Sequence, residues 1–545
     1  MKLAFAICVI ISATFLSLAA QEPAELILIN GKVFTSDLAN PYADAVAIRG
    51  DRILALGTSA EVRKLAAPAT RIIDLGGRTV VPGFNDAHAH FGPTFQGFDL
   101  QFKSQEPTWG EASAAIALAV AAAPKGQWIF GAVGESVIND ARAARSALDL
   151  IAPDHPVFLS TFFGHGAIVN SRGLAALKIS EGVSDPMGGR FERDAKTNKL
   201  TGRVFEYAVW NLGRILTDEG TDAQLTGTLQ SLAAEAASHG ITSMQIMPSI
   251  SIERFVRILN NARLPIRVRA MAFSTTTKSG RDLRDVRSLA TSKPAAPNVS
   301  ASGIKWIIDG TPLERGAAMS TPYLDKPDTK GRLNFSVAEI EKFVRQSIDL
   351  EQPLLVHAVG DLAVETLIDA MEKIGAERKI DWPSRRVRIE HAEGLTEKLI
   401  PRAKKLGIVV VQNPSHFTVV NEMNARLGKD TKLGLQRSLI DGGIMYALGS
   451  DGPINPFLNI MFAVIDPTRP DQAITREQAV RSYTYGSAYA EFAEAKKGML
   501  RPGMLADLAV LSQDIFNVPT NALPGTTSVM TIVGGRIVHD TTAFK

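Results

Sequence analysis

Cysteine is almost missing from this sequence: Cys8 is the only one among 545 residues. Disulfide bonds within the chain are therefore excluded. An excess of charge of one sign is missing as well, since 59 lysines and arginines stand against 56 aspartates and glutamates, a formal net charge of +3. So small a charge, without a basic run interleaved with aromatic residues, gives no indication of nucleic-acid binding.

Long apolar runs are confined to the N-terminus. Residues 3–18 are mostly apolar and uncharged, follow one lysine, and precede small residues. This pattern predicts a signal peptide over residues 1–20, cleaved near Ala19 or Ala20, rather than an uncleaved anchor, for which the stretch is short. Because Cys8 lies within it, the mature chain has no cysteine, which suits an oxidising compartment. We expect a secreted or periplasmic protein with no membrane segment after signal cleavage.

The rest of the chain has an ordinary globular composition, 45% hydrophobic and 21% charged, and is long enough for more than one domain. Its two ends, residues 21–78 and 498–545, share a pattern of short strands separated by turns, with a hairpin signal at Asn30-Gly31. This shared pattern predicts a β-sandwich built from both termini. Two independent β-modules are the alternative.

Between residues 79 and 497, segments typical of helices alternate with segments typical of buried strands. Eight segments have the strand pattern: 79–81, 240–247, 266–272, 304–308, 353–357, 387–391, 408–412 and 444–448. Eight such units predict an α/β fold, a (β/α)8 TIM-type barrel, whose chemistry lies at the C-terminal ends of the strands. A long insertion is expected at about residues 93–238.

Side chains that bind metals stand at the ends of several predicted strands. His88 and His90 are two residues apart, so in an extended chain both imidazoles point to the same face. Lys305 lies within the predicted strand 304–308, His357 and His391 each end a further strand, and Asp451 follows the last one. A single histidine at a strand end is usually a packing residue. Four strand-end histidines, joined by one aspartate and one lysine in the register of one barrel, predict a divalent-metal site.

These motifs resemble those of the amidohydrolase superfamily and, in finer detail, its family 3, the YtcJ-like branch. The sequence departs from that family after Asp309-Gly310, where Thr311-Pro312-Leu313-Glu314 stands in place of the usual small residues. The resemblance implies a barrel with a β-sandwich and metal-dependent hydrolysis, usually of C–N bonds. The matching segments span nearly the whole mature chain: 81–90, 152–157, 164–171, 305–310, 357–361, 389–392, 449–453 and 497–508.

The resemblance also implies the metal ligands. One divalent ion would be held by His88, His90 and Asp451. A second would be held by His357 and His391. Zinc is the expected metal, in one or two copies per chain, although this ligand set also suits other divalent ions.

Lys305 is the unusual member of the predicted ligand set. A free ammonium has no lone pair to offer a cation. Once CO₂ has carboxylated it, however, Lys305 becomes a carbamate that bridges two metals, as the resemblance implies. An ordinary lysine paired with a carboxylate is the alternative.

The remaining predicted roles concern catalysis and the substrate. Asp451 is expected to accept a proton from the attacking water and pass it to the leaving nitrogen. A metal, Arg315 or His165 would polarise the carbonyl. The residues expected to bind substrate are His165, Glu206, Arg315 and His416. For His165 a structural hydrogen bond, and for Glu206 a solvated position, are the alternatives. No chemistry is assigned to His155, His239 or His539.

The sequence therefore predicts a metal-dependent hydrolase that cleaves a non-peptide amide-type C–N bond of a small molecule. A metal-dependent esterase, isomerase or decarboxylase with the same ligands, or a metal-free binding protein on the same barrel, is the alternative. Beyond the small-molecule substrate we predict no nucleic-acid partner, and association into a homo-oligomer stays open.

Overall fold

The computed structural model describes residues 23–92 and 97–541 of the chain. The predicted signal peptide, residues 1–20, lies outside this range. Within it, no helix combines the length and the apolar character that crossing a membrane requires.

Eight parallel strands form a nearly closed barrel of the predicted TIM type. In the order in which they pair, they are β8 (Phe84–Phe91), β15 (Ile241–Pro248), β16 (Arg267–Phe273), β19 (Val299–Ile307), β20 (Leu354–Ala358), β21 (Arg388–His391), β22 (Val409–Gln412) and β23 (Met445–Leu448). Beyond β23, the backbone N–H of Asp451 donates to the carbonyl of His88 at 2.9 Å, which brings the last strand beside the first.

Helices cover the outer face of the barrel, so both faces of its strands are buried. Alternation within β21 turns Ile389 outward into this apolar layer and leaves Arg388 and Glu390 on the inner face. The covering helices include α7 (Asp222–Ser238), α8 (Ile252–Ala262), α10 (Val337–Asp349), α11 (Asp361–Arg378) and α13 (Ile400–Lys405). The inner face of β21 is therefore polar.

Seven of the eight predicted barrel strands coincide with observed ones, and the first does not. Thr79–Pro82 forms β7, which pairs with β2 (Lys32–Phe34) and β24 (Leu508–Leu511) in a sheet of the chain termini. The prediction that residues 79–81 open the barrel is therefore wrong, and β8 is its first strand. An apolar run predicts a buried strand but does not indicate which sheet that strand joins. Gly83 alone separates the two strands, and a Cβ there would lie 2.1 Å from Thr242.

The terminal segments form two sheets. One has the order β5-β4-β1-β6 and consists of β5 (Arg52–Gly57), β4 (Ala45–Arg49), β1 (Leu26–Ile29) and β6 (Arg71–Asp74). The other has the order β26-β25-β24-β7-β2-β3 and adds β26 (Arg536–Asp540), β25 (Ser528–Val533) and β3 (Tyr42–Ala43). Apolar residues of both sheets share one core. The Asn30-Gly31 turn does not close a hairpin, because β1 and β2 lie in different sheets.

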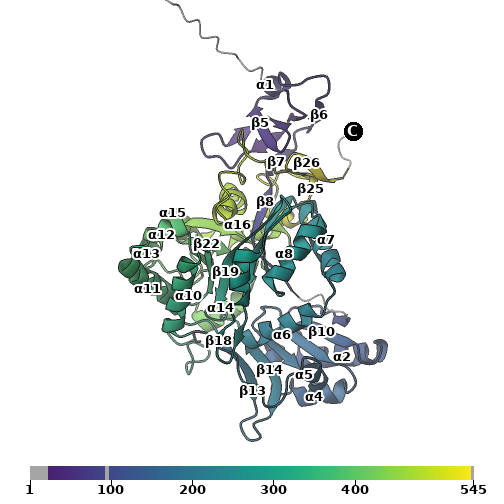
Figure 1. The fold of residues 1–545 in the computed structure, drawn as a ribbon, viewed down its shortest axis with the longest axis vertical. Helices are drawn as coiled ribbons and strands as arrows, with labels where there is room; N and C mark the ends of the chain where they lie inside the picture. Colours follow the sequence, from purple (N-terminus) through teal and green to yellow (C-terminus); the bar gives the residue numbers. More distant parts are fainter. Residues whose placement is uncertain (1–22, 93–96, 542–545) are drawn as a thin grey trace, which may run out of the picture.

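A long insertion between β8 and β15 carries a third sheet, of order β13-β14-β12-β11-β10-β9. Its strands are β9 (Gly97–Leu100), β10 (Trp128–Val133), β11 (Val157–Thr161), β12 (Gly166–Val169), β13 (Gly189–Arg193) and β14 (Leu200–Glu206). Its helices include α2 (Trp109–Ala122), α4 (Arg145–Ile151) and α6 (Tyr207–Asp218). Figure 1 shows the insertion at one end of the barrel and the terminal sheets, purple and yellow, at the other.

A buried ion pair joins the terminal sheets to the barrel. The Arg267 guanidinium on β16 donates to both carboxylate oxygens of Asp507, at 2.7 and 3.0 Å, and the Asp507 side chain is only 3% exposed. The Gly83 N–H donates to the Asp507 carbonyl at 2.9 Å. One residue thus holds the chain at the point where it passes from sheet to barrel.

We predict that Asp507→Asn lowers the free energy of unfolding by about 3 kcal/mol, because it leaves the Arg267 charge buried and unpaired. Chemical denaturation followed by circular dichroism measures this loss. Asp514→Asn is the matched control, since Asp514 pairs with Lys32, whose side chain is 63% exposed, and such pairs contribute at most about 1 kcal/mol. Equal losses in the two variants would contradict the prediction.

Candidate metal centre

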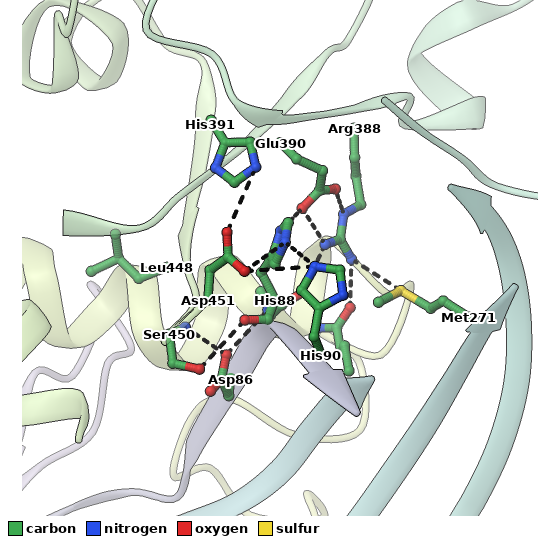
Figure 2. Close-up of polar contacts among 12 residues, drawn as sticks. Asp86, His88, His90, Met271, Arg388, Glu390, His391, Leu448, Ser450 and Asp451 are labelled. Atoms are coloured by element: carbon green, nitrogen blue, oxygen red, sulfur yellow. Dashed lines mark hydrogen bonds and ion pairs between the residues drawn. The ribbon is translucent and has the colours of Figure 1, made fainter. Parts of the chain in front are cut away.

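Four predicted ligands converge at the C-terminal ends of the barrel strands (Figure 2). The Nε2 atoms of His88 and His90, both on β8, lie 3.3 Å apart. Each also lies 3.6 Å from Oδ1 of Asp451, which follows β23. His391, which ends β21, places its Nε2 3.8 Å from the other carboxylate oxygen of Asp451. Three strands of the barrel therefore direct nitrogen and oxygen ligand atoms to one region.

The spacing of these atoms fits one divalent ion. Atoms that ligate a tetrahedral zinc ion at about 2.0–2.1 Å lie about 3.3–3.4 Å from one another. The proton of His88 is assigned to Nδ1, because this atom lies 2.6 Å from a Glu390 oxygen, and the lone pair of Nε2 then faces His90. Two imidazole nitrogens and a carboxylate oxygen facing one another form a ligand set for a cation.

The electrostatics of the histidines also fit a metal, which requires neutral imidazoles. Burial lowers the pKa of His88 below its ordinary value and that of His90 to about 3. Burial likewise lowers the pKa values of His357 and His391 well below normal, and neighbouring histidines and Lys305 add to the effect. All four are therefore neutral at pH 7.

The Asp451 carboxylate supplies the negative charge of this group. Burial alone would raise its pKa, but His88, His90 and His416 hold the pKa of Asp451 below its ordinary value, so it stays ionised. Asp451 has a φ of 41° and His391 a φ of 72°. Left-handed backbone costs about 1–3 kcal/mol at a non-glycine residue and concentrates at functional sites. The backbone conformation that orients the Asp451 and His391 side chains therefore lowers the stability of the fold.

An ion pair in the barrel interior supports His88. Glu390 accepts the His88 Nδ1–H and two donors of Arg388, at 2.8 and 3.0 Å, and all three side chains are fully buried. Arg388 also donates to Gln245 and to the Ala87 carbonyl. Burial alone would raise the pKa of Glu390, yet Arg388 and His88 hold it below its ordinary value. A carboxylate behind a histidine of this kind fixes the tautomer and raises ligand basicity.

Lys305 and His357 lie on the side of the second predicted ion. The ring of His357 is 4.5 Å from that of His391, centroid to centroid. Lys305, on β19, is 1% exposed, and burial lowers its pKa to about 8. No carboxylate in the described part of the chain forms an ion pair with the Lys305 ammonium. A lysine with so low a pKa has an appreciable neutral fraction, the form that reacts with CO₂.

His416, one of the predicted substrate residues, lies at the edge of this cluster. Its ring stacks on His391 at a centroid distance of 5.5 Å, and its Nε2 lies 3.7 Å from Asp451. The side chain is 38% exposed, unlike the ligands beneath it. It can therefore reach a molecule that enters the barrel mouth.

His165 and Glu206 come from the insertion, and His165 lies beside the ligand His357. His165 precedes β12 and Glu206 ends β14, and the His165 Nδ1 lies 3.0 Å from Glu206 Oε1. Glu314, from the loop after β19, places Oε1 4.0 Å from the same nitrogen. Although burial opposes it, Glu206 and Glu314 raise the pKa of His165 to about 9. The His165 and His357 rings are 5.1 Å apart, so the two groups adjoin.

Aromatic rings line the side of the site between β8 and the insertion. Phe273, which ends β16, meets the His90 ring edge-on at 5.6 Å. Trp210, on α6, lies 5.9 Å from Phe273 and 5.3 Å from His165. These two rings form an apolar wall along the row of histidines.

Arg315, also predicted to bind substrate, is engaged elsewhere. Its guanidinium pairs with Glu135 of the insertion and donates to Asp325 at 3.1 and 2.5 Å. Arg426 pairs with the same Glu135 carboxylate. The structure thus places Arg315 in a contact between the insertion and the barrel loops and does not bring it to the histidines.

The three histidines to which no chemistry was assigned each pair with a backbone carbonyl: His155 with Gln127, His239 with Glu235 and His539 with Ser528. Sequence reasoning missed Arg388, Glu390, Gln245 and Glu314. Glu390 directly precedes the predicted ligand His391 within the matching segment 389–392, so the sequence could have indicated a role for Glu390 next to the metal site. The contact with His88, 302 positions away, was not visible.

Comparison with known proteins decides the family. The family model described as "Amidohydrolase family" matches residues 71–539. The chain belongs to the amidohydrolase family. The resemblance inferred from the motifs is confirmed, and the protein is a metal-dependent hydrolase of that family, acting on C–N bonds.

Individual relatives agree with this assignment. The N-substituted formamide deformylase of Arthrobacter pascens is 28% identical over 95% of this chain and 99% of that protein. The putative amidohydrolase YtcJ of Bacillus subtilis (strain 168) is 27% identical over 94% and 98%. An uncharacterized metal-dependent hydrolase from Pyrococcus horikoshii OT3 shares the fold, with a TM-score of 0.70 and 23% identity over 91% of this chain and 99% of that one.

We predict that Glu390→Gln lowers zinc affinity about 10–100-fold, because His88 loses the carboxylate that fixes its tautomer. Competition with a chromogenic chelator measures the affinity. Glu494→Gln, which removes a partly exposed partner of Arg386, is the control and should leave it unchanged. Since Glu390→Gln also leaves Arg388 unpaired, Arg388→Met/Glu390→Gln should regain stability without regaining zinc affinity. Full affinity in the double variant would refute the role given to Glu390.

A second prediction concerns pH in chelator-treated protein. The pKa of His165 is raised from 6.5 to about 9, so its stabilisation is complete below pH 6.5 and is lost as the pH rises through 9. The loss amounts to about 3 kcal/mol. Denaturation at pH 6.5 and pH 9.5 should show a larger difference for the wild type than for His165→Gln. Parallel curves would mean that His165 is neutral in the folded state.

Proposed function

We propose that this amidohydrolase cleaves a non-peptide amide-type C–N bond of a small molecule. This proposal rests on one observation: four neutral histidines and one ionised aspartate converge around the buried Lys305. Residue types and spacing suit zinc, which His88, His90 and Asp451 would hold, with His357 and His391 holding a second ion. Lys305, as a carbamate, would join the two sites. A divalent ion there supplies Lewis-acid activation of water near neutral pH.

The side chains of the chain itself supply the proton transfers and the orientation of the substrate. Asp451, ionised and 21% exposed at its side chain, accepts a proton from water and returns it to the leaving nitrogen. His165 donates its Nε2–H to the carbonyl oxygen, since Glu206 occupies the Nδ1 side. His416 contacts the part of the substrate nearest the mouth.

The aromatic wall and the named relatives support a class of substrate. Phe273 and Trp210 offer apolar faces beside the ligands, so the substrate carries an apolar group next to the scissile amide. A relative is named N-substituted formamide deformylase, and N-substituted formamides are therefore the first compounds to test. We further propose that the two terminal sheets form the predicted β-sandwich and that the mature protein is secreted or periplasmic.

Product mass distinguishes the proposed reaction from its alternatives. Hydrolysis in H₂¹⁸O should give an amine and a carboxylic acid whose summed mass equals substrate plus water, with ¹⁸O in the acid. An unchanged mass would indicate an isomerase, loss of CO₂ a decarboxylase, and turnover of esters alone an esterase. The six predicted ligands should together hold about two divalent ions per chain in the metal-loaded enzyme, and none there would refute the proposal.

We predict that Asp451→Asn lowers kcat/KM at least about 100-fold, because the variant cannot accept the proton. The metal content of the variant is measured alongside, so that loss of catalysis can be separated from loss of metal. Asp514→Asn, on the terminal sheets, should keep full activity. A fully loaded Asp451→Asn enzyme with normal kcat would exclude Asp451 as the base.

A further inference from the structure

A second group of metal-ligating side chains lies beside the first and is not used by the six predicted ligands. His165, Glu206 and Glu314 each offer one ligand atom, and these atoms all lie within 4.8 Å of one another. Their side chains are 7%, 7% and 11% exposed. They come from two segments of the insertion and a barrel loop, so only the folded chain brings them together.

The distances within this group suit a common ion. His165 Nδ1 lies 3.0 Å from Glu206 Oε1 and 4.0 Å from Glu314 Oε1. Ligand atoms at about 2.0–2.2 Å from one ion are separated by about 3.0 Å at right angles and by about 4.2 Å when opposite. The observed separations fall between these limits.

Hydrogen-bond donors outside the group hold both carboxylates in place. Thr311 donates its backbone N–H and its hydroxyl to the two oxygens of Glu314, both at 2.5 Å. Asn334 donates its side-chain amide to Glu206 Oε2 at 2.9 Å. Hydrogen bonds of this kind orient ligating carboxylates in metal sites. These donors fix the two carboxylates, and in each the oxygen nearest to His165 Nδ1 is Oε1.

Glycines leave room for this convergence. A Cβ on Gly310 would lie 2.4 Å from Glu314 Oε1 and 2.9 Å from Glu206 Oε1, and one on Gly316 would lie 2.6 Å from Glu314 Oε1. Any larger residue at these positions would push the two oxygens apart. Glu206 itself has a φ of 55°, a strained conformation that turns its side chain toward the group.

The charge of the group also calls for a cation. Two buried carboxylates, those of Glu206 and Glu314, face the one imidazole of His165. Arg315, the residue after Glu314, is turned away to Glu135 and Asp325. Glu314 lies in the segment where this sequence departs from its family, so this excess of negative charge is a property of this chain.

We propose that His165, Glu206 and Glu314 form a further divalent-cation site, separate from the ligands on β8, β21 and β23. The cation takes one nitrogen and two carboxylate oxygens and leaves His165 Nε2–H directed toward the substrate. It fixes the insertion to the barrel loop across the mouth of the site.

Zinc counts and crystallography test this site. The wild type and Glu314→Gln, freed of metal and dialysed against the same free Zn²⁺ concentration with bicarbonate, are compared by elemental mass spectrometry. We expect one ion fewer per chain in Glu314→Gln. Crystals of the zinc-loaded wild type should show anomalous density between the three side chains. Glu314→Ser repeats the comparison with a small residue, and Glu422→Gln, which changes a glutamate outside the group, should keep the wild-type count.

The outcomes separate this inference from the proposed function. Equal zinc counts in the wild type and both Glu314 variants would overturn the further site alone, as would anomalous density at His88 and His90 only. Either result would mean that His165 and Glu206 form only a hydrogen-bonded pair. Absence of zinc from both groups would overturn the proposed function as well. Circular dichroism confirms that each variant is folded before its metal is counted.

Discussion

The buried pair of Glu390 and Arg388 is the interaction on which the metal centre depends. Two opposite charges in the dry barrel interior cost several kcal/mol each to desolvate, and they are tolerated because their hydrogen bonds are nearly complete. Arg388 reaches Gln245 on β15 and the backbone of β8, so the pair ties three strands. These contacts fix the orientation and the tautomer of the His88 imidazole, and the lone pair of its Nε2 then faces His90.

The neighbouring ligands repeat the same balance between burial and charge. Burial favours the neutral form of each histidine. By itself, burial would also neutralise Asp451, and the site would lose the negative charge that a metal ion needs. The neighbouring histidines and Lys305 lower the pKa of Asp451 and so hold it ionised instead. Each group therefore takes the protonation state that a metal needs because of its neighbours, and a change at one position alters the others. The buried ligands of this site have to be considered together.

Much of the barrel was readable from the sequence because its signals are local. Seven strands and their helices follow from apolar runs and period, and the strand-end histidines followed from counting along them. The first strand was misplaced because Thr79–Pro82 and β8 are separated by Gly83 alone, and an apolar run does not say which sheet it joins. The Asn30-Gly31 turn was misread for a similar reason. Its local geometry is that of a tight turn, with φ of 54° at Asn30, but its strands pair with distant partners.

The parts of the site that could not be predicted are those made by long-range pairing of charges. Arg315 was expected at the substrate because its sequence position lies near the barrel mouth, yet Glu135, 180 positions away, engages it. Glu314, one residue earlier, was noted only as a departure from the family, and it turns inward where Arg315 turns out. Arg315 itself has a left-handed φ of 59°. The left-handed backbone at Arg315 therefore lets two neighbouring side chains point in opposite directions. The Arg315 guanidinium reaches the insertion, and the Glu314 carboxylate faces His165 and adds negative charge at the mouth of the site.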